Sequence, residues 1–338
     1  MQGWKALAAG ALAFAAGHAQ AAGNVVVYCG VNEEWCRAAS AAFEQKTGIH
    51  VDMTRQSAGE IFARLRAERA NPRGDIWFGG TGDPHLQAAS DGMLEPFQSP
   101  ALPQLRDWAQ TQAKLSEYRT VGLYLGALGF GYNNDELTRR KLTAPACWSD
   151  LVKPEFKGEV QMADPNSSGT AWTALATLVQ LLGEGPAFDY LKQLNRNIDQ
   201  YTTAGAAPSQ AVGRGETMVG VAFQHDFVDA AKHYKAVRVV SPCEGTGFEI
   251  GSMSLVKGAR HPDEAKAFYE WALSAEAQAI AGRSGAYQIP SNTGTPVPPE
   301  APDIANMKLI DYNFAKFGSS AERTRLLSRW TREVKNGG

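Results

Sequence analysis

The sequence has no strong excess of charge of either sign and no apolar run long enough to cross a membrane. Its 338 residues include 33 Lys and Arg against 35 Asp and Glu, for a formal net charge of −2. Nucleic-acid-binding proteins usually carry a basic excess or patch, so we expect no nucleic-acid partner. With 44% hydrophobic and 20% charged residues, the chain is typical of a globular protein rather than a disordered one.

Cysteine is scarce, and the motifs of common enzyme and metal sites are missing. The four cysteines form no CxxC pair and the six histidines show no HxxxH spacing, so we predict no metal site and no cofactor. GxSxG, HExxH, GxxxxGK[ST] and a GxGxxG after a strand are also absent, although these mark many hydrolases and nucleotide-binding proteins. We therefore predict that the protein is not an enzyme. An exported phosphate-ester hydrolase is the alternative.

The first residues have the pattern of a secretory signal. Lys5 supplies a positive charge, an Ala-rich apolar stretch over 6–16 follows, and Ala19-Gln20-Ala21 is a small-x-small cleavage site. The apolar stretch is shorter than the roughly 20 residues of a membrane span. We predict that residues 1–21 are a signal peptide and that the mature protein is periplasmic. An uncleaved anchor is the alternative.

An even number of cysteines in an exported chain favours disulfides. Cys29 follows a predicted strand and Cys36 lies in the first turns of the next helix, so this pair is within local reach. Cys147 and Cys243 would then form a long-range bridge. Free buried thiols are the alternative for all four.

Short apolar strands alternate with helices, which predicts an α/β fold with parallel sheets. The first α/β unit opens the mature chain, and a second one follows the extended segment at 120–133. A second extended segment, at 248–256, ends this second unit. The predicted elements of the first unit are strands at 25–28, 49–53 and 75–78 and helices at 35–46 and after Ser57. Those of the second are strands at 158–162, 218–223 and 237–240 and helices at 170–182 and 187–194.

The two extended segments predict that the second unit is inserted into the first. After them we expect one amphipathic helix over 263–281, a Pro-rich loop over 290–302 and a polar helical segment over 304–334. Two facing lobes would enclose a ligand, because ligands of such sheets bind at the carboxyl ends of the strands. The predicted division is 22–129 with 249–300 for the first lobe, 130–248 for the second, and 301–338 for C-terminal helices packed on the lobes.

Three turns that start helices combine hydroxyl groups with glycines. They lie at 55–60, 79–83 and 165–170. A helix N-terminus has free N–H groups and a partial positive charge, and it can bind an anion. Plain N-capping is the alternative for each turn alone, but the three together predict a phosphate or carboxylate held between the lobes. The predicted phosphate-binding residues are Arg55, Ser57, Thr81, Ser167, Ser168, Gly169 and Thr170.

A second group of polar residues follows the strand predicted at 218–223. His225 and Asp226 come directly after this strand, and Glu249 begins the second extended segment. Vicinal hydroxyls pair well with carboxylate oxygens, so His225, Asp226 and Glu249 are predicted to bind a polyol. An anion end and a polyol end together describe a sugar phosphate.

Several of these segments resemble the periplasmic solute-binding proteins of ABC importers. The resemblance is narrower to the family usually called ferric-iron-binding, and within it to the hexose-phosphate-binding branch. It implies a two-lobed α/β fold of the type II periplasmic-binding class with two crossover strands as hinge, a monomer, an organophosphate ligand and an ABC permease partner in the inner membrane. The segments that carry it are 25–28, 48–49, 74–77, 128–133, 165–170 and 245–247 with Glu249.

The branches of this family differ in their ligand. Ferric binders use adjacent tyrosines, whereas no two of the ten tyrosines here are neighbours. The sugar-phosphate branch uses a His-Asp pair and a later Glu, which His225, Asp226 and Glu249 match in order and spacing. We predict that the protein captures a hexose phosphate for import. Binding of Fe(III), or of another organophosphate or a phosphonate, is the alternative.

Overall fold

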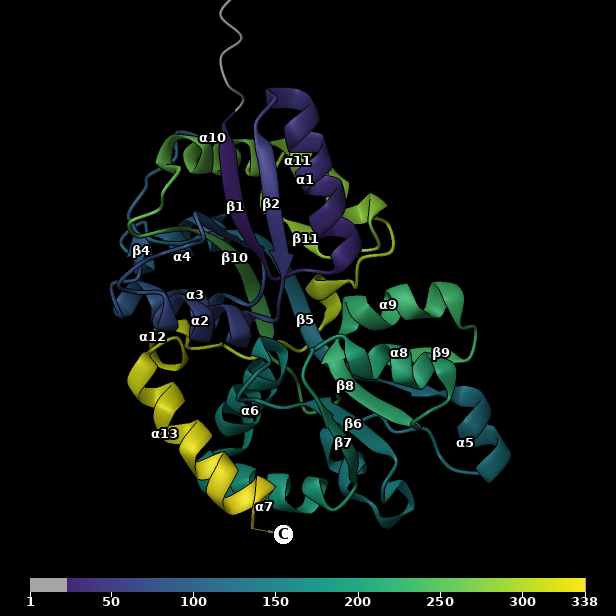
Figure 1. Cartoon of the computed structure of the whole chain (residues 1–338). Coiled ribbons are helices and arrows are strands. Elements are labelled where there is room, and N and C mark those ends of the chain that lie inside the picture. The colour runs from purple at the N-terminus through teal and green to yellow at the C-terminus, as the bar shows by residue number, and fades with distance from the viewer. Residues whose placement is uncertain (1–22, 338) are drawn as a thin grey trace, which may run out of the picture.

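The computed structural model describes residues 23–337, so the predicted signal peptide lies outside the described residues. Figure 1 shows two lobes, each a sheet covered by helices, with the chain passing between them at the centre. No helix of the described part combines the length and the apolar character that a bilayer span requires.

The first lobe is built on parallel strands. β1 pairs in parallel with both β2 and β3, so their carboxyl ends lie at one edge of the sheet. Turns at this edge lead into the helices that follow each strand. The elements are β1 (Asn24–Cys29), α1 (Glu33–Thr47), β2 (His50–Arg55), α2 (Ala58–Ala67), β3 (Ile76–Phe78), α3 (Gly82–Ser90), β4 (Leu94–Glu95) and α4 (Asp107–Leu115).

The second lobe repeats this plan. β6 pairs in parallel with β7 and β8, and its carboxyl edge faces that of the first lobe (Figure 1). The sequence analysis missed α5, β7 and α9. The elements are α5 (Asn134–Arg140), β6 (Val160–Ala163), α6 (Gly169–Leu182), α7 (Glu184–Asn195), β7 (Ile198–Thr202), α8 (Ala207–Arg214), β8 (Val219–Phe223), α9 (Gln224–His233) and β9 (Val237–Val240).

One long strand belongs to both sheets. β5 (Val121–Asn133) pairs with β10 (Phe248–Val256) as far as Ala127, and from Leu128 onward it pairs with β8. The two extended segments predicted at 120–133 and 248–256 are therefore antiparallel strands at the junction of the lobes. They join the lobes without a loose linker.

Each lobe has its own hydrophobic core. Phe43, Phe78 and Phe268 are buried in the first, and Trp148 and Trp172 are buried in the second. Burying an aromatic side chain of this kind contributes roughly 1.5–3 kcal/mol. The lobe boundaries predicted at 129–130 and 248–249 remain a proposal.

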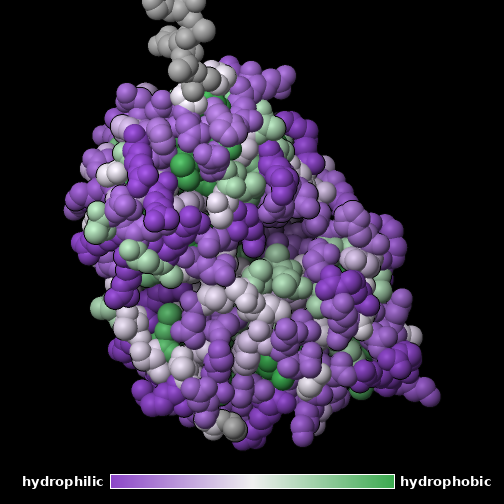
Figure 2. Space-filling model, in the orientation of Figure 1, coloured by the Kyte–Doolittle hydropathy of each residue, from purple (hydrophilic) through white to green (hydrophobic). Residues whose placement is uncertain are grey.

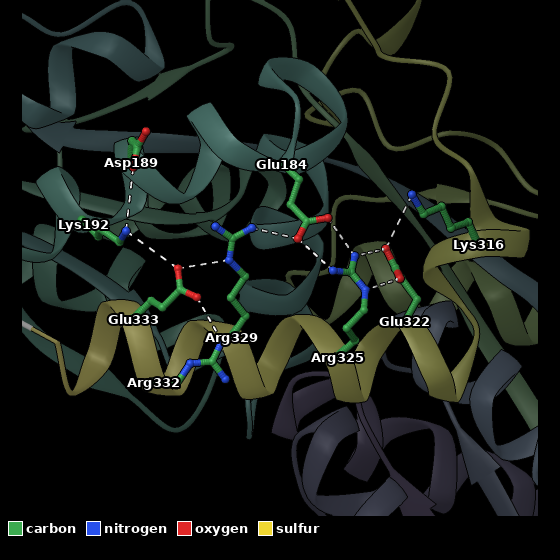
Figure 3. A network of polar contacts seen from close by, with 9 residues as sticks. All are labelled: Glu184, Asp189, Lys192, Lys316, Glu322, Arg325, Arg329, Arg332 and Glu333. Atoms are coloured by element: carbon green, nitrogen blue, oxygen red, sulfur yellow. Dashed lines mark hydrogen bonds and ion pairs between the residues drawn. The ribbon is translucent and has the colours of Figure 1, made fainter.

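The C-terminal helices pack on the second core. Leu326 and Trp330 of α13 (Ser320–Trp330) are fully buried there. Figure 3 shows that Arg325 and Arg329 of α13 both contact Glu184 of α7, with Nη1–Oε1 distances of 2.8 Å. Ion pairs this exposed contribute little to stability, so the buried side chains are the main attachment of α13 to the second lobe.

Two predicted helices are interrupted. The helix expected over 263–281 is two helices, α10 (Pro262–Ala272) and α11 (Ala275–Arg283), because Ser274 caps a new start by accepting from Ala277 N at 3.2 Å. The segment expected to be helical over 304–334 contains an extended stretch before α12 (Phe314–Phe317). In that stretch Leu309 pairs with Thr246, which explains why the helix does not continue.

Both predicted disulfides are confirmed. Cys29 pairs with Cys36, with their Cα atoms 6.0 Å apart, and Cys147 pairs with Cys243 at a Cα distance of 4.8 Å. The first bridge spans 7 residues and the second spans 96.

We expect the two bridges to differ in their effect on stability. In the chain-entropy model, Cys147→Ala/Cys243→Ala lowers the free energy of unfolding by roughly 4–5 kcal/mol and Cys29→Ala/Cys36→Ala lowers it by about 2 kcal/mol. The difference arises because the Cys147–Cys243 bridge closes the longer loop. Urea unfolding of both double variants measures the difference. Equal losses would contradict the loop-length argument.

Candidate functional site

A cleft of about 940 Å³ lies between the lobes, at the carboxyl ends of the parallel strands. Figure 2 shows the surface hollowed where the lobes meet. The cleft brings together all but one of the predicted phosphate- and sugar-binding residues. Those that line it are Arg55, Ser57, Thr81, Ser168, Gly169, Thr170, His225, Asp226 and Glu249.

Three helices begin at this cleft. Ser57, Thr81 and Ser168 are the N-cap residues of α2, α3 and α6, so two helix starts come from the first lobe and one from the second. Each start presents free N–H groups and a partial positive charge. Together they form a site suited to an anion.

The three hydroxyls have different surroundings. Ser168 Oγ accepts from Ala171 N at 3.3 Å, and Ser57 Oγ is 2.7 Å from Glu60 Oε2, so both take part in capping. Thr81 Oγ1 is buried and has no hydrogen-bond partner among the described residues. Buried hydroxyls are nearly always bonded, which makes Thr81 the hydroxyl best placed to bind a ligand.

The lobes touch at these same turns. Ser57 Oγ is 2.7 Å from Ser167 O across the lobe boundary. A Cβ at Gly169 would lie 1.9 Å from Thr81 Oγ1, so this approach is possible only with glycine at 169. The structure is therefore a closed form of the two lobes.

Ser167 is the predicted site residue that does not line the cleft. Its Oγ lies 3.3 Å from both Asp164 O and Thr203 O, so the hydroxyl is directed to its own lobe. Its carbonyl oxygen contacts Ser57 instead. Ser167 thus belongs to the contact between the lobes.

Two buried carboxyl groups face the other end of the cleft. Burial raises the pKa of Asp226 to about 7; nearby Asp229 adds to this, while Arg55 opposes it. Burial also raises the pKa of Glu249 well above its usual range, helped by Asp226 and Asp83. A carboxyl group in this setting can accept or donate a hydrogen bond, depending on its protonation.

His225 is neutral in this setting. Burial lowers the pKa of its imidazole to about 3, so the 3.5 Å approach of Nε2 to Asp226 Oδ1 is not an ion pair near pH 7. Gln288 Nε2 lies 3.0 Å from His225 Nε2 and donates to it, which places the ring proton on Nδ1. His225 Nδ1 has no partner among residues 23–337 and can donate to a ligand.

Further cleft residues were missed by the sequence analysis. Tyr124 lies in the middle of β5, where its OH accepts from Gly80 N at 3.0 Å. Gln288 lies just before β11 (Ile289–Pro290), and Gly205 and Ser209 line the cleft at the start of α8. Only α8 had a local signal, because Pro208 in its first turn marks a helix start.

Within the described residues, the carboxyl and imidazole groups of the cleft are not grouped closely enough to hold a metal ion. Within the described part of the chain, the one cluster of His, Cys, Asp and Glu atoms compact enough for an ion is Cys147, Cys243 and Glu244. Both of its sulfurs are joined in a disulfide.

Comparisons with known proteins fit this architecture. The model of a family described as bacterial extracellular solute-binding protein matches residues 80–317. A Haemophilus influenzae protein with no functional name is 44% identical over 321 residues, which cover 94% of this chain and 93% of that protein.

Solved structures of binding proteins are similar as well. AfuA from Actinobacillus pleuropneumoniae, a periplasmic binding protein with fructose-6-phosphate bound, gives a TM-score of 0.91 at 44% identity over 93% of this chain and 99% of that one. The periplasmic binding protein P5PA gives 0.89 at 37% identity over 92% and 99%. Iron-bound HitA from Pseudomonas aeruginosa gives 0.75 at 21% identity over 91% and 99%, which shows a likeness of fold alone. The predicted two-lobed α/β fold is confirmed.

The raised pKa of Asp226 predicts a pH-dependent stability. Because its folded pKa of about 7 exceeds its ordinary value of 3.8, the folded protein binds more protons between these values, and the free energy of unfolding falls as the pH rises through that window. Asp226→Asn removes this loss. We expect its melting temperature without ligand to exceed that of the wild type by about 2–5 °C at pH 8 and to be similar at pH 4.

Thermal unfolding over a pH series measures this difference. Asp189→Asn is the control, because the Asp189 side chain is 74% exposed on α7. If the melting temperatures of Asp226→Asn and the wild type changed in parallel with pH, burial would not destabilise the charged form of Asp226.

Proposed function

The chain belongs to the bacterial extracellular solute-binding proteins, which capture small molecules for ABC transporters and work with membrane permeases, and from this premise we propose that it captures a hexose phosphate. We propose further that it does so in the periplasm, as a monomer, and delivers the ligand to a permease in the inner membrane. One observation carries the proposal: a single cleft joins converging helix starts to a cluster of buried carboxyl and imidazole groups.

The phosphate would bind at the helix starts. N–H groups of α2, α3 and α6 and the free hydroxyl of Thr81 are donors suited to a dianion. The Arg55 guanidinium also lines the cleft, where its Nε donates to Val31 O at 3.0 Å. These donors come from both lobes, so a bound phosphate would favour the closed form.

The sugar would bind at the opposite end. Sugar hydroxyls donate to carboxylate oxygens and accept from N–H groups, and Asp226, Glu249 and His225 offer both kinds of partner. The similarity to AfuA, solved with fructose-6-phosphate, supports a ligand of this class.

The alternatives fit these contacts less well. Fe(III) favours phenolate ligands, but burial and the nearby carboxyl of Glu249 raise the pKa of Tyr124 well above its usual range and disfavour its phenolate. A phosphonate without hydroxyl or amino groups would use the helix starts but leave the carboxyl groups at the sugar end unpaired. A hydrolase would need an activated nucleophile. The cleft hydroxyl of Thr81 has no base bonded to it among the described residues, and that of Ser57, which contacts Glu60, also takes part in the contact with Ser167 between the lobes.

The sugar end can be tested separately from the phosphate end. We expect Asp226→Ala to weaken binding of glucose 6-phosphate or fructose 6-phosphate by about 10–100-fold, because hydrogen bonds to a charged group contribute roughly 1.5–3 kcal/mol. Binding of inorganic phosphate should change little. Thr81→Val should weaken all three ligands alike. Calorimetry on both variants, with Asp189→Ala as control, measures this.

Different outcomes would point to different functions. No heat with any organophosphate would refute the proposal, and equal losses in Asp226→Ala would remove the sugar role of Asp226. A charge-transfer band on adding ferric iron with a carrier anion would favour an iron binder. Release of phosphate from the sugar phosphate would favour a hydrolase.

Closure over the ligand predicts a second effect. Gly169→Ala places a Cβ against Thr81 Oγ1, so we expect the affinity for hexose phosphates to fall by about tenfold or more. Small-angle scattering should show the ligand-bound variant to be more extended than the ligand-bound wild type. Gly185→Ala is the matched control, because a Cβ there meets no atom within 4 Å. Unchanged affinity and scattering would show that closure does not need this contact.

A further inference from the structure

A second groove lies between the lobes, separate from the ligand cleft. It has a volume of about 900 Å³ and is lined by α2 and α3 of the first lobe and by α13, which packs on the second. In Figure 1 it lies between α2 and α13, on the left of the molecule. Gly59 and Asn166 line it beside the Ser57–Ser167 contact, so this contact separates the groove from the cleft.

The groove carries an excess of positive charge. Arg66, Arg69, Arg323 and Arg332 line it, against the single carboxylate of Asp91. Arg66 and Arg69 are exposed and enter no ion pair within residues 23–337. Arg332 pairs with Glu333 at 3.0 Å, and Arg323 is buried beneath the groove floor. Like charges held on facing surfaces repel each other. An anion bound between the arginines would lower this electrostatic repulsion.

A buried amide without partners lines the same groove. Gln87 is 0% exposed, and neither its Nε2 nor its Oε1 has a hydrogen-bond partner among the described residues. Positions 83, 87 and 91 lie on one face of α3 because they are four residues apart. Asp83 is bonded by Tyr312 at 2.7 Å and Asp91 by Ser320 at 2.8 Å. Asp83 Oδ1 also has no partner among the described residues, so Gln87 is the member of this face whose polar side-chain atoms are all unbonded.

Arg323 presents a second donor of this kind. Its Nη1 is buried without a partner in the described part, and its guanidinium lies 5.0 Å from the centre of the Trp172 ring. Buried polar groups without partners are costly and rare in folded proteins. Gln87 Nε2 and Arg323 Nη1 are thus two unpaired N–H donors at one groove, while the buried carboxyl of Asp83 lies near enough to Arg323 to stabilise its charge. An acceptor bound in the groove would satisfy both donors.

We propose that the groove binds a small oxyanion of the sulfate or phosphate class when the lobes are closed. Arg66, Arg69 and Gln87 would contact it from the first lobe, Arg323 from α13, and Arg332 from the π-helical turn Thr331–Lys335 that follows α13. Because its ligands come from both lobes, the anion stabilises the closed form, and it raises the affinity of the cleft for its own ligand by the same factor by which that ligand raises the affinity of the groove.

Sulfate titration followed by nuclear magnetic resonance tests the site directly. With ¹⁵N-labelled mature protein at constant ionic strength, we expect saturable shifts of the Gln87 side-chain amide and of backbone amides at 320–324. Arg66→Ala/Arg69→Ala should weaken this binding about tenfold or more, since each charged hydrogen bond contributes substantially. Both residues are exposed, so the fold should be retained. Arg73→Ala/Arg196→Ala is the control, with the same change of charge at exposed arginines outside the groove.

The readouts separate this site from the ligand cleft. Shifts confined to Thr81 and Ser168 would mean that sulfate binds the cleft alone, and Gln87 signals unaffected by millimolar sulfate would mean that the groove holds only water. Either result overturns the proposal, as does equal weakening in both double variants. If no hexose phosphate binds the cleft but Gln87 still responds to sulfate, the groove site stands while the proposed function fails.

Discussion

Three helix starts facing one another across the lobe boundary are the constraint on which the rest of the site depends. α2, α3 and α6 each place a partial positive charge near the same point. Their approach is close enough that residue 169 has to be glycine. Such an arrangement is unfavourable when it is empty and favourable around an anion, so a phosphate bound there as proposed would favour closure of the lobes.

The opposite end of the cleft holds carboxyl groups instead of helix starts, so it is suited to hydrogen-bond donors rather than to an anion. Burial raises the pKa of both Asp226 and Glu249, and the nearby carboxyl of Asp226 adds to the shift of Glu249. Hydroxyl donors from a ligand would stabilise their charged forms. A net charge of −2 gives the whole molecule no attraction for anions, so the proposed recognition of a phosphate would have to come from these local dipoles and hydrogen bonds.

The sequence was most informative where local chemistry determines structure. Helix starts at Ser57, Thr81 and Ser168 have their own signal, because capping residues and glycines lie next to apolar helical patterns. Tyr124 and Gln288 could not be found this way, since tertiary packing alone brings them to the cleft. Ser167 was misplaced because adjacent residues of one turn point in different directions. The break between α10 and α11 could have been predicted, because Ser274 is a typical N-cap residue within the long amphipathic pattern.

Strand β5 limits how the two lobes can move relative to each other. Because a single strand is hydrogen-bonded into both sheets and lies antiparallel to β10, the lobes cannot diffuse independently as they would on a flexible tether. Their relative movement is limited by β5 and β10 and by the segment between Pro290, which pairs with β5 in the first sheet, and Tyr312, which is buried in the second core. Little conformational entropy is then left to lose when the lobes meet. The fold itself has already supplied most of the ordering that a tight complex requires.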